Sequence, residues 1–93
     1  MEEYRHDIRV DCEERCILHR GALHHFATVR NISFGGALVN SKLKPLGLHT
    51  GDYCIISVDG EFFGEYSCEV LRVETPDIAL KFTGIHKIKA VEH

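Results

Sequence analysis

The sequence predicts an all-β protein, a six-stranded antiparallel β-barrel with a flexible N-terminal arm. Three features of the 93 residues predict it: apolar and polar residues alternate in several stretches, turn-forming residues recur at short intervals, and no long stretch has helical apolar spacing. Closing a small sheet into a barrel removes the edge strands that an open sheet exposes. We therefore expect an arm over residues 1–9 and a single barrel domain over residues 10–93.

The first half of the chain is expected to form three strands. The first strand is marked by alternating apolar side chains at Ile8, Val10, Cys12, Cys16 and Leu18. A turn at residues 20–22 leads into a second strand from Phe26 to Arg30. A short third strand covers residues 37–39, and the Pro- and Gly-containing residues 41–52 form a connecting loop.

The second half is expected to form three more strands. The apolar run Tyr53 to Val58 is followed by Asp59-Gly60, a dipeptide that favours a type I′ hairpin. A long strand from Phe62 to Val73 changes its apolar phase between Val70 and Leu71, which indicates a β-bulge. After a turn at Pro76-Asp77, the last strand carries the alternating residues Ile78, Leu80 and Phe82.

The C-terminal tail shows a different spacing. Ile85, Ile88 and Val91 are three residues apart, which is typical of one or two helical turns packed on the barrel. We therefore expect at most a short C-terminal helix.

Composition narrows the class of function. The apolar fraction of 44% is ordinary for a globular protein, and no run approaches the roughly 20 apolar residues that span a bilayer. The N-terminal residues lack the pattern of a secretory signal, so we expect a cytoplasmic protein without membrane insertion. The net charge of −3 argues against binding to DNA or RNA polymers. A small anionic ligand needs only local positive charge, and most of the arginines lie in the first third of the chain.

Cysteines and histidines raise the question of a metal site or an enzyme. On a strand, Cys12 and Cys16 would be about 13 Å apart, too far to share a metal ion. On a helix they would share a face with His19, and a site would be conceivable. The absence of a C-x-x-C pair favours buried free thiols instead, for Cys54 and Cys68 as well.

The histidines do not form a catalytic pattern. His24 and His25 on a strand would point to opposite faces. No residues form a nucleophile–base–orienter pattern, so the sequence indicates a protein that is not an enzyme.

Two short motifs carry the most specific information. Arg5-x-x-x-Arg9 lies in the arm, and Asn31-x-Ser33-x-x-Gly36 follows the second expected strand. Taken singly, each also fits a solvated arm or an ordinary turn. Together, and with the strand pattern, they resemble the signature of the PilZ family, small β-barrels that bind the bacterial second messenger cyclic di-GMP. The resemblance implies a ligand-binding signalling protein with no other cofactor and no metal.

The residue types suit such a ligand, which presents two phosphodiester charges and two guanine bases. Arginine's planar fork meets two phosphate oxygens, or guanine N7 and O6, with two hydrogen bonds at once. The resemblance implies that Arg5 and Arg9 clamp the ligand and that Asn31 and Ser33 contact a base. The other ligand-binding assignments concern Gly36 of the second motif and residues beside the two motifs. Gly35 and Gly36 would allow a special backbone conformation or close ligand approach. Tyr4 would stack on a base, and Arg30 would reach a phosphate. We expect Phe34 to lie in the core.

The expected mechanism is a transition to order, in which the arm closes over the dinucleotide and an unidentified protein effector reads the altered surface. One alternative is a PilZ-like adaptor that binds protein partners without cyclic di-GMP. A nonspecific RNA-binding barrel is less consistent with the sequence, because the aromatic residues are expected in the core or barrel wall rather than on a basic groove: Tyr53, Phe62, Phe63 and Tyr66.

Overall fold

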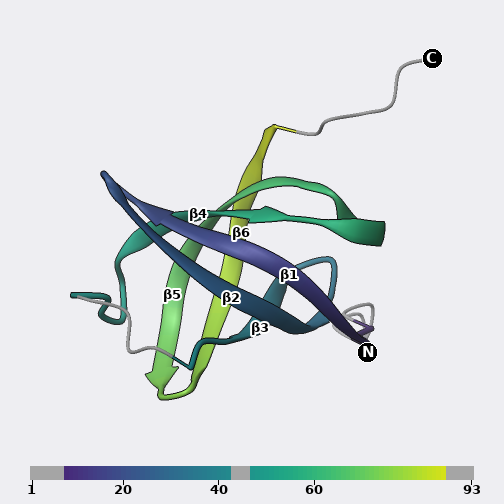
Figure 1. Cartoon of the computed structure of the whole chain (residues 1–93), viewed down its shortest axis with the longest axis horizontal. Helices are drawn as coiled ribbons and strands as arrows, with labels where there is room; N and C mark the ends of the chain where they lie inside the picture. Colours follow the sequence, from purple (N-terminus) through teal and green to yellow (C-terminus); the bar gives the residue numbers. More distant parts are fainter. Residues whose placement is uncertain (1–7, 43–46, 88–93) are drawn as a thin grey trace, which may run out of the picture.

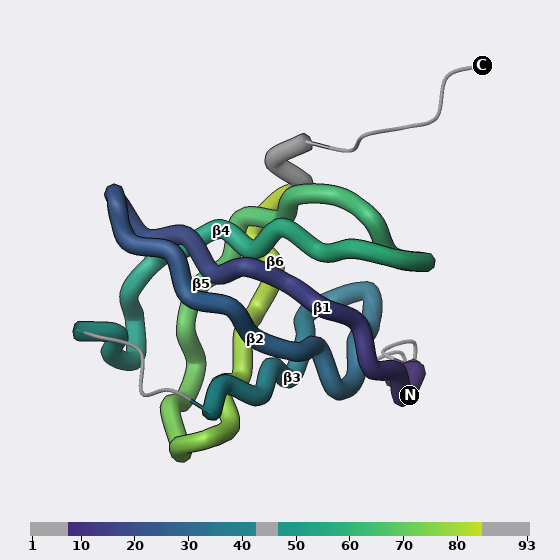
Figure 2. Tube along the Cα trace, in the orientation of Figure 1, coloured from purple at the N-terminus to yellow at the C-terminus, as the bar shows by residue number. Residues whose placement is uncertain are grey.

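The structure is a closed barrel of six strands (Figures 1 and 2). This computed structural model describes residues 8–42 and 47–87. The strands are β1 (Val10–Arg20), β2 (Leu23–Ile32), β3 (Gly36–Asn40), β4 (Tyr53–Val58), β5 (Gly64–Glu74) and β6 (Asp77–Lys87). They follow the order β1-β2-β3-β6-β5-β4 around the barrel, and each neighbouring pair is antiparallel. The expected six-stranded antiparallel barrel is confirmed.

Most strand positions agree with the sequence pattern. β4 has the predicted bounds. β2 is longer than the predicted Phe26–Arg30 because its pairing with β1 continues from the hairpin at Arg20↔Leu23 to Val10↔Ile32. The predicted bulge in β5 is confirmed: Val70 pairs with Leu80 and Arg72 with Ala79, so Leu71 is the extra residue.

The predicted type I′ hairpin at Asp59-Gly60 is wrong. That turn requires positive φ at both residues. Gly60 has a φ of 82°, but Asp59 is extended, with φ −93° and ψ 171°. The Asp59 amide donates a hydrogen bond of 3.0 Å to the Arg15 carbonyl, which keeps Asp59 alongside β1. The chain then turns through a short 3-10 helix, η2 (Gly60–Phe62), before β5 begins.

The barrel interior is a single apolar core supplied by all six strands. Strict alternation places Cys54, Ile56 and Val58 of β4 inside, and Val29 and Val39 are completely buried. Three of the four cysteines, Cys16, Cys54 and Cys68, are buried, Cys12 is half-buried, and all four are free thiols. The expectation of buried thiols is therefore confirmed for three of them.

The aromatic residues divide differently from expectation. Phe34 is 94% exposed, so its predicted core position is wrong: it sits at the tip of the turn between β2 and β3. Tyr53 and Phe63 are also exposed. Phe62 and Tyr66 do pack against the core. Tyr53 is exposed because its neighbour Cys54 takes the inward position of the strand.

The ends of the chain are only partly described. Ile85 belongs to β6, where it pairs with Tyr66, so the predicted helical turn does not begin there. Ile88 and Val91 lie outside the described residues, as does most of the expected arm, residues 1–7. Within the described part of the chain, no helix has the length and apolar character needed to cross a membrane.

Candidate functional site

The turn between β2 and β3 is organised by the Ser33 side chain. The amides of Gly35 and Gly36 each donate a hydrogen bond of 3.2 Å to Ser33 Oγ. The hydroxyl in turn donates to the Gly36 carbonyl at 3.3 Å, and the Ser33 amide donates to the same carbonyl at 2.8 Å. Ser33 is itself buried. Its hydroxyl therefore fixes the backbone of the turn, as serine commonly does.

Gly36 is required by a close approach of two strands. A Cβ on Gly36 would collide with the carbonyl oxygen of Leu80 on β6. The Phe82 amide also donates to the Gly35 carbonyl at 2.8 Å, which ties the turn to β6. The φ of Gly36 is not positive. Glycine is thus required here by close packing against the backbone of β6, a reason that the sequence did not suggest, and the expected special backbone conformation is not observed.

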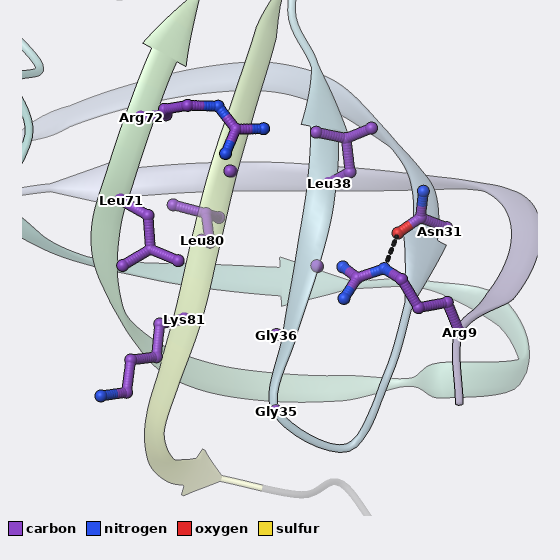
Figure 3. Close-up of a pocket in the computed structure, with 11 residues that line it drawn as sticks. Arg9, Asn31, Gly35, Gly36, Leu38, Leu71, Arg72, Leu80 and Lys81 are labelled. Carbon is purple, nitrogen blue, oxygen red and sulfur yellow. Dashed lines mark hydrogen bonds between the residues drawn. The ribbon is translucent and has the colours of Figure 1, made fainter. Parts of the chain in front are cut away.

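Arg9 joins the two motifs. Its Nε donates to Asn31 Oδ1 at 2.9 Å, and its Nη1 donates to Ser33 Oγ at 3.4 Å. This contact is possible because Val10 at the start of β1 pairs with Ile32 at the end of β2, which brings the residues beside them together. The side chain then extends over β3, as Figure 3 shows.

Arg9 and Asn31, with Gly35 and Gly36, form one side of a hollow of about 360 Å³ on the outer surface of the barrel, here called the Arg9 hollow. Arg72 enters from β5 on the opposite side, and Arg9 and Arg72 extend toward each other over β3 and β6 (Figure 3). Lys81 also lines the hollow, although its ammonium group extends away from the two arginines. No carboxylate is among the described lining residues, so the hollow is cationic in a chain with net charge −3.

The floor of the Arg9 hollow is apolar. Leu38 of β3 pairs with Ala79 of β6, and both line the hollow beside Leu71. A surface of this kind, apolar in the middle with guanidinium groups at the rim, suits a flat ring system that carries negative charges.

Two β-bulges direct side chains into the hollow. Arg30 is the extra residue between Val29 and Asn31 in the β2–β3 ladder, and Leu71 is the extra residue between Val70 and Arg72 in the β5–β6 ladder. The residues that follow, Asn31 and Arg72, both line the hollow. Bulges commonly re-aim side chains beside functional sites in this way.

The structure brings together five of the residues that the sequence indicated: Arg9, Asn31, Ser33, Gly35 and Gly36. Arg30 is exposed and does not line the hollow. Tyr4 and Arg5 lie outside the described residues. Sequence reasoning missed Arg72, Lys81 and Leu71. The bulge at Leu71 was the available signal, but only the strand order shows that β5 and β6 pass beside the turn.

A second hollow begins on the other side of the same turn. This apolar groove, here called the Phe34 groove, has a volume of about 610 Å³ and is lined mainly by Ile8, Val10, Phe34, Phe62, Tyr66 and Phe82. Ile8 and Val10 flank Arg9 in sequence, so neighbouring residues of one segment line two different hollows. Among the described residues, no three His, Cys, Asp or Glu side chains cluster as a metal site.

The family model of the PilZ domain matches residues 3–91, nearly the whole chain. None of the curated proteins matches the chain. The matched range includes both motifs and all six strands.

Proposed function

The chain belongs to the PilZ domain family, and from that premise we propose that it is a receptor that binds cyclic di-GMP in the Arg9 hollow. PilZ domains are a family of cyclic di-GMP-binding domains and are generally non-catalytic. We propose the same for this chain, together with the cytoplasmic location usual for such proteins. Some PilZ proteins do not bind the dinucleotide, so the residues of this site carry the proposal.

The observation that carries it is the linkage of the two motifs through one guanidinium group. Arg9 bonds to both Asn31 and Ser33. These bonds position the guanidinium group at the wall of the hollow, and a phosphodiester or a guanine edge accepts two hydrogen bonds from such a group. Restricting the arginine before binding lowers the entropy lost when the ligand arrives.

The rest of the hollow supports the same ligand. Arg72 adds a second guanidinium across from Arg9, and a cyclic dinucleotide has two phosphodiesters to neutralise. Leu38, Leu71 and Ala79 give an apolar floor against which a base or ribose can lose its contact with water. In this proposal Asn31 reads a guanine edge, and Ser33 acts mainly by positioning Arg9 and the turn.

We propose that the signal passes through the segment that carries Arg9. Arg5, in the same motif, would complete the clamp when residues 1–9 close over the ligand. Ile8 and Val10 line the Phe34 groove, so a shift of Arg9 toward the ligand also moves the wall of that groove. An unidentified protein effector would read the change.

The test is a calorimetric titration of the full chain with cyclic di-GMP, beside GTP and GMP. We expect saturable binding of the cyclic dinucleotide only. Arg9→Ala should weaken binding roughly 10- to 100-fold, because one charge-assisted hydrogen-bonding group is worth about 1.5–3 kcal/mol. The double variant with Arg5→Ala should show no measurable binding.

Two control variants make the result specific. Arg15→Ala removes an exposed arginine of β1 that does not line the hollow, so it should bind like the wild type. Arg9→Lys keeps the charge but loses the fork, and it should bind more weakly than the wild type. Absence of any heat from the wild-type chain at saturating cyclic di-GMP would favour the ligand-independent adaptor.

A further inference from the structure

Two buried cysteines face each other on neighbouring strands at a distance from the Arg9 hollow. Cys54 of β4 pairs directly with Cys68 of β5, in a ladder that has no register shift. Both side chains point into the barrel, where Cys54 is 6% exposed and Cys68 is 0% exposed. Because the two residues are directly opposite and on the same face, their sulfur atoms approach each other across the ladder.

The spacing of such a pair suits a disulfide. Directly opposite residues of antiparallel strands have Cα atoms about 4.5 or about 5.5 Å apart. Disulfides in proteins span Cα distances of about 4.4 to 6.8 Å. Bridging Cys54 and Cys68 therefore requires side-chain rotation but no separation of the strands.

The pair lies beside a hollow at the surface, where Cys54 keeps 6% exposure. A hollow of about 260 Å³ is lined by both Cys54 and Cys68, together with His19, Arg20, Ser67 and Thr83. None of these residues lines the Arg9 hollow or carries the proposed cyclic di-GMP site. Thr83 also lines the Phe34 groove. The hollow is large enough for a hydroperoxide such as hydrogen peroxide.

We propose that Cys54 and Cys68 form a redox-active dithiol that hydrogen peroxide converts into a disulfide across β4 and β5. Cys54 attacks first: its thiol loses a proton, the thiolate forms an S–O bond as the O–O bond of the peroxide breaks, and the released hydroxide takes up that proton, which leaves a sulfenic acid and one water molecule. The Cys68 thiol then attacks the sulfenic sulfur, the S–S bond forms, and a second water molecule leaves. The pair is oxidised by two electrons and the peroxide is reduced by two.

The surroundings assign these roles. Interaction with the Cys68 thiol, and more weakly the positive charge of Arg20, lowers the pKa of Cys54. Interaction with Cys54, together with burial, raises the pKa of Cys68. Cys54 is 6% exposed and Cys68 is fully buried. Cys54 is therefore the thiol that peroxide meets first, attacking as the thiolate, and Cys68 is the resolving thiol. Cys16, also buried in this part of the core, has a pKa raised to about 12, mainly by burial, and stays protonated.

The experiment treats the reduced, folded full chain with hydrogen peroxide, alkylates the remaining thiols under denaturing conditions, and maps the peptides without reduction. Before alkylation we expect the intact mass to fall by about 2 Da, for two hydrogen atoms. After alkylation we expect a cross-linked peptide that joins Cys54 to Cys68. Recovery of both residues as alkylated thiols would overturn the proposal, and so would a disulfide that uses Cys16 or Cys12.

Variants add a second readout. Cys68→Ser should stop at the sulfenic acid of Cys54, which a dimedone-type reagent traps, whereas Cys12→Ser should form the disulfide at the wild-type rate. The wild-type peptide map locates the bridge without any variant, so the test does not depend on a core serine being tolerated. Trapping of sulfenic acid at Cys68 in Cys54→Ser, at the rate seen for Cys54, would contradict the assigned order.

Discussion

The barrel combines regular strand ladders with irregular ones, and the two kinds do different work. The β1–β4 and β4–β5 ladders run without a register shift. The β2–β3 and β5–β6 ladders, which flank the Arg9 hollow, contain the bulges at Arg30 and Leu71. In the regular ladders every second residue enters the core, whereas Leu71 and Arg72 are consecutive residues that are both exposed.

The difference shows how one small sheet provides both a core and a site. An uninterrupted ladder determines which face of the sheet each side chain occupies, because a shift of one position in the pairing would turn the buried side chains toward solvent. A bulge relaxes this constraint locally and lets adjacent side chains share the outer face. We therefore expect stability to depend most on the regular ladders and ligand affinity on the bulged ones.

The largest effect is expected from Ile56→Ala in β4, a regular strand. Ile56 is 0% exposed, and truncating a buried isoleucine to alanine costs about 2–5 kcal/mol. Ile55→Ala is the matched control, because Ile55 is the adjacent, half-buried residue on the opposite face. Its cost should be less than half as large. Urea unfolding followed by circular dichroism measures both, and equal costs would contradict the inside–outside division of the regular ladder.

The second effect concerns the floor of the Arg9 hollow. Gly36→Ala forces β3 and β6 apart, because the new methyl group meets the Leu80 carbonyl. Overpacking of this kind costs about 1–3 kcal/mol, and cyclic di-GMP affinity should fall with it.

Gly84→Ala is the control for Gly36→Ala. Gly84 lies in β6, the strand that Gly36 packs against, but an added Cβ there meets no atom within 4 Å. The free energy of unfolding should therefore change by less than about 0.5 kcal/mol. Full stability of Gly36→Ala would show that the two strands can separate freely, and that the hollow is not held by this contact.

This contrast also explains what the sequence could predict. The pattern of apolar residues and turn signals identified all six strands, and it located β4 to the residue because that apolar run is bounded by Asp52 and by Asp59-Gly60. It placed Phe34 in the core because an apolar residue next to a strand looks like part of that strand in the sequence. In the structure Phe34 belongs to the turn that Ser33 organises, and its side chain is exposed. It failed at Asp59-Gly60 because the Asp59 amide bonds to β1, a long-range contact.

The site was predictable only where its residues form a local motif. Arg9, Asn31 and Ser33 were identified from two short patterns, and the structure joins them. Arg72 and Lys81 belong to no motif. They reach the hollow because β5 and β6 follow β3 around the barrel, an order that alternation does not specify.

A third, smaller effect is expected from Arg72, the cationic residue that follows the bulge in β5 and lines the hollow. Arg72→Ala should weaken cyclic di-GMP binding by about 1 kcal/mol, roughly fivefold, because exposed ionic contacts are weak and Arg72 Nε already bonds to Glu74 at 3.3 Å. The loss should shrink as salt is added.

Glu74→Gln tests Arg72 in the opposite direction, because it should raise the affinity for cyclic di-GMP. It releases Arg72 from its acidic neighbour and should strengthen binding slightly. Calorimetry at two salt concentrations compares both variants with the wild type. An Arg72→Ala protein with wild-type affinity would mean that the bulge at Leu71 has no role in the site.

The smallest effect is a pH dependence located in the regular ladders. His19 of β1 contacts Ser57 of β4, Nε2 to Oγ at 2.8 Å. Burial, then the neighbouring His24, lowers the pKa of His19 below its ordinary 6.5, and Glu65 opposes this only in part. The unfolded chain therefore takes up the proton first as the pH falls.

The contribution of neutral His19 to stability is accordingly complete above pH 6.5 and declines as the pH falls from there through the lowered folded-state pKa. Urea midpoints measured between about pH 7.5 and about pH 5.5 should fall, and the fall should be shallower in His19→Gln, which keeps a hydrogen-bonding group but does not titrate. His49→Gln is the control, because His49 is exposed in the loop before β4 and lies outside the regular ladders. Parallel curves for the wild type and His19→Gln would show that the regular ladders carry no titrating group, and would leave the carboxylates as the source of any pH dependence.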